Sequence, residues 1–258
     1  MIFLKFLIIT KRHLVIATSL ILGAVIIGVG AFSFGAFAKS NRLVPIYCVE
    51  KAEKVVALSF DAAWGNEDTE QLISILGKYN IKATFFVVGS WVDKYPESVK
   101  QLSDAGHSIQ NHSNSHPHMP QLSVADMTKE LQTCNDKIES VTGVRPTLFR
   151  APYGDYDNTM LNTVTGLNMY TIQWDVDSRD WKKEYTTDMI VKGVTENVKE
   201  GSIVLFHNAA VNTPKALPII IEKLIANGYK FALIKDLIYK DNYIVDHAGK
   251  QCKVKDGE

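Results

Sequence analysis

Short apolar runs alternate with amphipathic helical patterns from about residue 55 to residue 238 of this chain. Val55–Phe60 is a nearly continuous apolar run, which is typical of a strand covered on both faces. Residues 124–141 place apolar side chains at four-three-four-three spacing, the pattern of one face of a helix. Strand followed by helix, repeated about seven times, predicts a parallel sheet covered by helices. A (β/α) barrel and an open doubly wound sheet both fit this pattern.

Polar side chains follow the predicted strands at the points where the strands end. In either fold, the ligand lies at the carboxyl ends of the strands, so these side chains should form one site. They are acids, imidazoles and one guanidinium: Asp61, His112, His116, Arg150, Asp177, Asp180 and His207. Such a set suits a metal-dependent hydrolase. The chain has neither a glycine-rich nucleotide loop nor a GxSxG nucleophile motif.

Two histidines four positions apart, His112 and His116, lie in a segment of small polar residues. On a helical turn this spacing would put both imidazoles within reach of one divalent metal ion. The spacing alone is a weak indication, and an acid such as Asp61 after a strand often only caps the next helix. The metal hypothesis therefore depends on the other polar residues at the strand ends.

Five segments in this order resemble the motifs of polysaccharide deacetylases, the NodB-homology enzymes of carbohydrate esterase family 4. They are Ser59–Asp61, Asn111–His116, Arg150–Gly154, Asp177–Trp181 and Leu205–His207. The resemblance covers about Val55 to Ile238 and implies an α/β fold, a distorted (β/α)7-type barrel with parallel strands. Phe60–Gly65, behind an N-terminal apolar segment, is most similar to the sporulation members of the family.

The resemblance implies a catalytic role for four residues. Asp61 would be the general base, and Arg150 would pair with it and keep it ionised. His207 would be the general acid that protonates the leaving amine, and Asp180 would orient it. A structural alternative exists for two of them, since Arg150 could be a plain ion-pair partner and Asp180 could only shape a loop.

The resemblance also implies a substrate wall and a metal site. The backbone N–H of Tyr153 would be an oxyanion-hole donor, and Trp181 and Leu205 would surround the acetyl methyl group. His112 and His116 would be two of the three protein ligands of a divalent metal, zinc or else cobalt or another ion.

The expected third metal ligand is missing. In the family an acid directly follows the base, whereas this chain has Ala62, which carries no donor atom. A catalytic zinc normally has three protein ligands, so the loss of one weakens the site. Asn66, Glu67 or Asp68 could replace the ligand, or water or substrate could complete the shell of a weakly held ion. Alternatively, the domain has lost hydrolysis and keeps a glycan-binding groove.

Leu14–Ala38 contains no charged residue, and Lys11 and Arg12 precede it. This length is enough to cross a bilayer, and the positive charges predict that residues 1–13 stay in the cytoplasm. We therefore expect a single-pass membrane anchor with the domain outside the cytoplasm. The alternative is that this stretch is a signal peptide. Cleavage near Ala38 would then leave a secreted protein.

The rest of the chain divides into three predicted segments. They are a tether over residues 39–54, the deacetylase domain over residues 55–240 and a C-terminal tail over residues 241–258. Cys48 and Cys252 flank the domain and could form a disulfide outside the cytoplasm, and Cys134 is predicted to be a buried free thiol.

The expected function is metal-dependent hydrolysis of N-acetyl groups from a cell-wall polysaccharide, peptidoglycan in a spore-cortex setting. One alternative is a catalytically weak or inactive glycan-binding protein, and another is an enzyme that acts on a non-glycan amide. The 28 basic and 28 acidic residues balance, which gives no reason to expect a nucleic-acid partner. The expected partners are the glycan and, through the N-terminal helix, the membrane, and the protein is expected to be a monomer.

Overall fold

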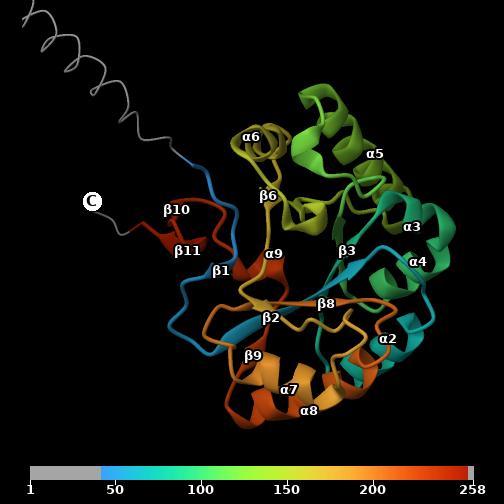
Figure 1. Ribbon diagram of the computed structural model, residues 1–258, viewed down its shortest axis with the longest axis vertical. Helices are drawn as coiled ribbons and strands as arrows, with labels where there is room; N and C mark the ends of the chain where they lie inside the picture. Colours follow the sequence, from blue (N-terminus) through green and yellow to red (C-terminus); the bar gives the residue numbers. More distant parts are fainter. Residues whose placement is uncertain (1–41, 255–258) are drawn as a thin grey trace, which may run out of the picture. The chain divides into compact units, whose positions relative to one another are not determined.

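A parallel sheet lies at the centre of the fold in the computed structural model, which describes residues 42–254 (Figure 1). Its strand order is β6-β5-β4-β3-β2-β8-β7, and β9 pairs with β2 beside this path. Every pairing in this sheet is parallel. The strands are β2 Val55–Ala62, β3 Thr84–Val87, β4 Ser108–Asn111, β5 Leu148–Phe149, β6 Tyr170–Thr171, β7 Val176–Asp177, β8 Ile203–His207 and β9 Lys230–Phe231.

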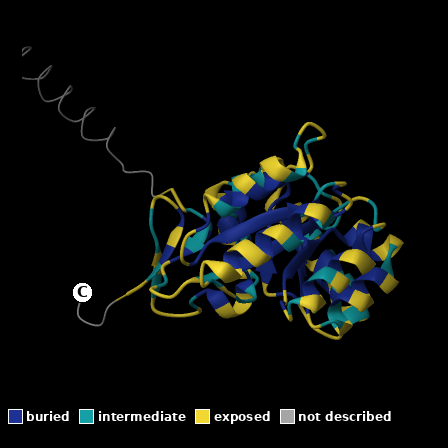
Figure 2. Cartoon of the chain, turned by 90° about the horizontal axis from the view of Figure 1, so that it is seen from below, coloured by how far each residue is buried: buried dark blue, intermediate teal, exposed yellow. Residues whose placement is uncertain are grey.

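Helices connect the strands and cover the sheet, with their exposed faces turned outward (Figure 2). They are α2 Thr69–Lys78, α3 Gly89–Lys94, α4 Pro96–Asp104, α5 Val124–Thr142, α6 Asn158–Gly166, α7 Thr187–Thr195, α8 Thr213–Ala226 and α9 Ile234–Leu237, with 3₁₀ turns η1 Met119–Gln121 and η2 Pro152–Gly154. Helix α5 starts where the Ser123 hydroxyl accepts from the Asp126 N–H, and it ends at Gly143 with a left-handed φ of 71°. The helix predicted over residues 124–141 is confirmed.

The sheet is an open half-barrel in the part of the chain that the structure describes. Strands β6 and β7 stand at the two ends of the strand path and do not pair with each other there. Each has only two residues, which leaves little backbone for a closing ladder. The parallel α/β prediction is confirmed, and the half-barrel fits a (β/α)7-type fold.

A small second sheet joins the two ends of the described chain. It consists of β1 Cys48–Val49, β11 Lys250–Lys253 and β10 Tyr243–Val245, in that order. Cys48 faces Lys250 across this pairing, and all three cysteines of the chain are free thiols, so the possible Cys48–Cys252 disulfide is not formed. Cys134 is buried, as predicted.

The predicted anchor, residues 14–38, lies outside the described residues, as do residues 1–13 and 255–258. Within residues 42–254, no helix has both the length and the apolar character needed to cross a bilayer.

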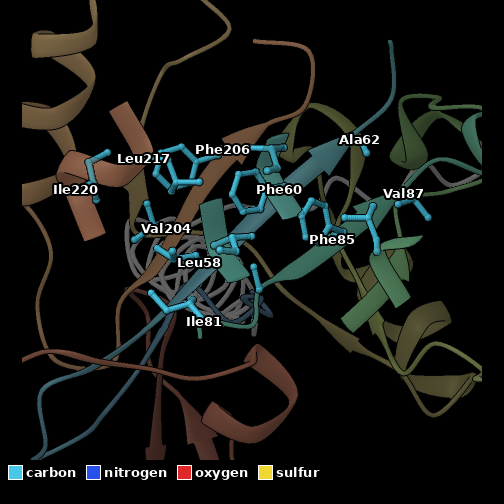
Figure 3. Packing of buried hydrophobic residues seen from close by; sticks show 14 of the residues in the cluster. Leu58, Phe60, Ala62, Ile81, Phe85, Val87, Val204, Phe206, Leu217 and Ile220 are labelled. Carbon is cyan, nitrogen blue, oxygen red and sulfur yellow. The ribbon is translucent and has the colours of Figure 1, made fainter. Parts of the chain in front are cut away.

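Strand β2 divides its side chains between the core and the site. Leu58, Phe60 and Ala62 point into the main apolar cluster, where the Phe60 ring stacks against Phe85 and Phe206 at centroid distances of 4.8 and 5.4 Å (Figure 3). Successive side chains of a strand face opposite ways, which turns Asp61 to the other face. The base position is therefore anchored between two buried apolar residues.

Candidate active site

The polar residues at the strand ends meet around one cavity of about 460 Å³, as the parallel sheet predicts. It is lined by Asp61, Ala63, Trp64, His112, His116, Ala151, Tyr153, Gly154, Trp174, Asp177, Trp181, Leu205 and His207. All the predicted site residues line it except Arg150 and Asp180, which are buried and contact residues that do. Asp61 and His207 are direct cross-strand neighbours on β2 and β8.

Asp61 is held as a carboxylate by a buried guanidinium. Arg150 Nη1 donates to Asp61 Oδ1 at 2.8 Å, while Nη2 donates to Ser59 Oγ and to the Gln173 carbonyl. Burial opposes the charge on Asp61, but Arg150, together with His112, outweighs burial and lowers the pKa of Asp61 below its ordinary value. Asp61 is therefore an ionised base at neutral pH.

The pKa of His207 is shifted in the opposite direction, toward the protonated ring. Its Nδ1 lies 2.8 Å from Asp180 Oδ1, and its backbone N–H donates to Asp180 Oδ2 at 2.9 Å. Burial alone would favour the neutral ring, but the hydrogen bond and charge of Asp180 outweigh it and raise the pKa of His207. A carboxylate that is held ionised and an imidazole whose protonated form is favoured thus face one cavity.

Replacing Asp180 by Asn is expected to lower the pKa of His207, because the ring loses the charge that offsets its burial. The His207 ring signals, followed by NMR against pH, should titrate at lower pH in the variant than in the wild type. Asp177→Asn is the matched control, since Asp177 lines the same cavity without a hydrogen bond to that ring. An equal shift in both variants would contradict the assigned role of Asp180.

His112 and His116 meet without the expected helical turn. The backbone after β4 is irregular there, and Ser113 and His116 have left-handed φ values of 67° and 62°. The two rings nevertheless come together with centroids 5.0 Å apart. The two imidazoles lie close together, as a shared site requires, but the helical turn expected from their spacing is not formed.

Both histidines are suited to metal binding in their protonation state. His112 Nδ1 lies 2.8 Å from the Arg150 carbonyl and donates to it, which leaves the Nε2 lone pair free. Burial lowers the pKa of His112, and burial followed by the neighbouring His112 lowers that of His116 to about 4. Neutral imidazoles are what a divalent ion requires.

The third ligand is not replaced by the residues after Ala62. Asn66 Nδ2 donates to Ser98 Oγ, and Asp68 Oδ2 accepts from the Ala209 N–H. None of the candidate residues 66–68 lines the cavity. Among residues 42–254, no three His, Cys, Asp or Glu side chains form a group that could hold a metal. The donors present fit two positions of a metal shell and leave the third empty.

Sequence comparison places these observations in a family. The family model described as polysaccharide deacetylase matches residues 49–172. Peptidoglycan-N-acetylmuramic acid deacetylase PdaA of Bacillus subtilis is 31% identical over 201 residues, which cover 75% of this chain and 75% of PdaA. The chain belongs to the polysaccharide deacetylase family. PdaC of the same organism, also a peptidoglycan-N-acetylmuramic acid deacetylase, is 36% identical over 73% of this chain.

Solved structures of the family show the same fold. BA3943 of Bacillus anthracis, described as a CE4 family pseudoenzyme, is 33% identical, with a TM-score of 0.72 over 82% of this chain and 73% of its own. The chain spans only 40% of PdaC and 60% of another B. subtilis relative, YlxY.

Several residues of this deacetylase-family site were not singled out from the sequence, among them Trp64 and Thr213. Trp64 lines the cavity and is 61% exposed, and Thr213 donates to Asp180 Oδ2 at 2.5 Å from the start of α8. Trp64 could have been found as an aromatic residue in a polar loop after β2. Thr213 carries no sequence signal, because its role depends on how α8 packs.

Proposed function

We propose that this protein hydrolyses N-acetyl groups of peptidoglycan. The observation that carries the proposal is the pairing of Asp61 with Arg150 and of His207 with Asp180 around one cavity. A module that only binds glycan has little use for an ionised base beside an acid whose protonated form is stabilised. The names of PdaA and PdaC support peptidoglycan as the polymer.

The chain's own residues supply two proton transfers. Asp61 accepts a proton from the water that attacks the acetyl carbonyl, and His207 donates a proton to the nitrogen as the C–N bond breaks. The products are acetate and the free amine of the sugar. Trp181 and Leu205, on the cavity wall, surround the acetyl methyl, and the Tyr153 backbone N–H stabilises the developing oxyanion.

A divalent ion, zinc or cobalt, would be held by His112 and His116 in this proposal. When bound, it would polarise the carbonyl and lower the pKa of a water molecule. Because Ala62 provides no donor, we expect a weakly held ion and slow hydrolysis.

Acetate release from N-acetylated peptidoglycan by the purified protein tests the proposal. Added Zn²⁺ or Co²⁺ should increase the rate, and a chelator should abolish it. His116→Gln should weaken the binding of zinc measured by calorimetry, whereas His118→Gln, its matched control, should not. Undetectable acetate at saturating metal would contradict the proposal.

A second candidate function is glycan binding with little or no hydrolysis. Ala62 favours it, and so does the similarity to BA3943, a pseudoenzyme by its description. In that case the glycan should bind to the purified protein without release of acetate at any metal concentration.

The proposed setting is the outer face of a membrane, with residues 14–38 as the anchor and the protein as a monomer. The charge-free stretch and the basic residues before it support this orientation. A role in sporulation is part of the same proposal, and it depends on the resemblance of Phe60–Gly65 to the sporulation members.

A further inference from the structure

A second cavity, of about 550 Å³, lies directly beside the reaction cavity. Trp64, Trp181 and His207 line both cavities. A ligand with its reacting group near His207 can therefore extend around these side chains into the second space. Its volume is in the range of sites that hold small organic groups.

The walls of this second cavity are held together by hydrogen bonds between three loops. Asn208 binds the loop after β2, where its Oδ1 accepts from the Ala63 N–H and its Nδ2 donates to the Gly65 carbonyl. Asn212 Nδ2 donates to the Tyr185 carbonyl and so ties the loop after β8 to the loop after β7. The cavity is thus preorganised, which lowers the cost of ordering on binding.

Apolar surface and positive charge combine in its lining. Ala209, Ala210 and Val211 contribute the apolar part, and Val211 is 79% exposed. Lys182 and Lys183 contribute two ammonium groups. A partner for this surface should carry both small apolar groups and negative charge.

The two lysines are available to such a partner. Neither has a carboxylate within 4 Å among residues 42–254, and the Lys182 Nζ lies over the Trp181 ring, 5.5 Å from its centroid. Asp180 also lines the cavity, but its oxygens are engaged by His207 and Thr213. The unpaired charge at this cavity is therefore positive.

A muramic-acid residue carries two neighbouring substituents that could occupy the two cavities. In a muramic-acid residue the acetamide is on C2 and an O-lactyl group is on the adjacent C3. The lactyl group carries a methyl and a carboxyl, which is a free carboxylate where no peptide is attached and is otherwise joined by an amide bond to a short acidic peptide. A residue with its acetamide beside His207 would direct this substituent into the neighbouring space, whereas a glucosamine residue has only a hydroxyl there.

We propose that the second cavity binds the acidic O-lactyl substituent of a muramic-acid-type residue and so selects this sugar over glucosamine. The inference rests on the proposed function and deepens it. Trp64 and Trp181 separate the acetyl group from the substituent, and Lys182 and Lys183 bind the carboxylate.

The test is calorimetric binding to the full chain in the presence of a chelator, so that no hydrolysis intervenes. Three ligands are compared: a peptidoglycan tetrasaccharide with free lactyl carboxylates, the same tetrasaccharide with these carboxylates amidated, and chitotetraose. The protein should bind the carboxylate form about five- to tenfold more tightly than the amide, the size expected of two partly exposed ion pairs. The preference should shrink in high salt.

Lys182→Gln/Lys183→Gln should abolish this preference and leave the affinity for chitotetraose unchanged. Lys129→Gln, an exposed lysine on α5, should keep it. Equal binding of the carboxylate and amide forms, or a preference that survives the double substitution, would overturn the inference alone. Failure of all three ligands to bind would contradict the proposed glycan substrate as well.

Discussion

Ala62→Asp is expected to increase metal-dependent acetate release on the order of 100-fold, the size of effect that one stabilising group typically has on catalysis. The substitution adds a carboxylate next to Asp61 at the end of β2, and it can act as a ligand only by turning from the apolar cluster that Ala62 contacts toward His112 and His116, whose imidazoles are already neutral. A third protein ligand brings the donor set to the number usual for catalytic zinc. Zinc affinity, measured by competition with a chelating dye, should increase together with the rate.

The same substitution should make folding stability depend on metal. Ala62 is 1% exposed, belongs to the apolar cluster and is the cross-strand partner of Val87 (Figure 3). A carboxylate there without a partner is costly, so the melting temperature of the metal-free variant should fall below that of the wild type. Added zinc should recover it, because binding to the native state stabilises that state.

Ala62→Asn is the matched control, because it has the size of Asp without the charge. It should lower the melting temperature without gaining zinc affinity or activity. A variant Ala62→Asp that binds zinc no better than Ala62→Asn would contradict the two-ligand interpretation. A mutant of the pseudoenzyme BA3943 is described as having restored enzymatic activity.

The sequence predicted most of the site because parallel sheets impose a simple geometry. Asp61, Arg150 and His207 lie at or just after the ends of three different strands, and the carboxyl ends of those strands meet at one edge. Their chemical types then indicated a base, its partner and an acid. The convergence of the strand ends does not depend on the exact strand lengths. These residues therefore meet even though the sheet is an open half-barrel.

What the sequence could not show depends on local backbone and on packing between distant segments. Ser113 and His116 bring the two imidazoles together through left-handed φ values, which spacing alone does not predict. Thr213 donates a hydrogen bond to Asp180, and Asn208 donates one to the loop after β2. Both bonds join residues that are far apart in the chain. The walls of the second cavity are held by hydrogen bonds of this kind between loops, so no single sequence motif predicts the cavity.

Arg150→Met is expected to lower the free energy of unfolding by about 3–5 kcal/mol at neutral pH, the usual cost of leaving a buried charge without its partner. Arg150 is fully buried, stacks on the Phe86 ring at 4.1 Å and binds Asp61, Ser59 and the Gln173 carbonyl. Met fills a similar volume, so the main loss is electrostatic. Urea denaturation measures the change.

Two variants separate this charge effect from a general packing defect. Asp61→Asn/Arg150→Met removes both charges and should recover part of the lost stability. Arg145→Met removes a surface arginine that contacts Asp136 and Glu139, and it should cost less than about 1 kcal/mol. If Arg150→Met and Arg145→Met cost the same, the buried pair does not hold Asp61 as an ion.

The pH dependence of Arg150→Met gives a second, independent readout. In the wild type the pKa of Asp61 is lower in the folded than in the unfolded chain, so the pair's stabilisation is present above a pH of about 4 and is lost as the pH falls through the folded-state pKa. Without Arg150, burial should raise the pKa of Asp61 above its unfolded value, and protonation then relieves the unpaired charge. The difference in stability between the two proteins should therefore be largest at neutral pH and shrink on acidification. A difference that stays constant from pH 7 to pH 4 would show that Arg150 acts through packing rather than through its charge.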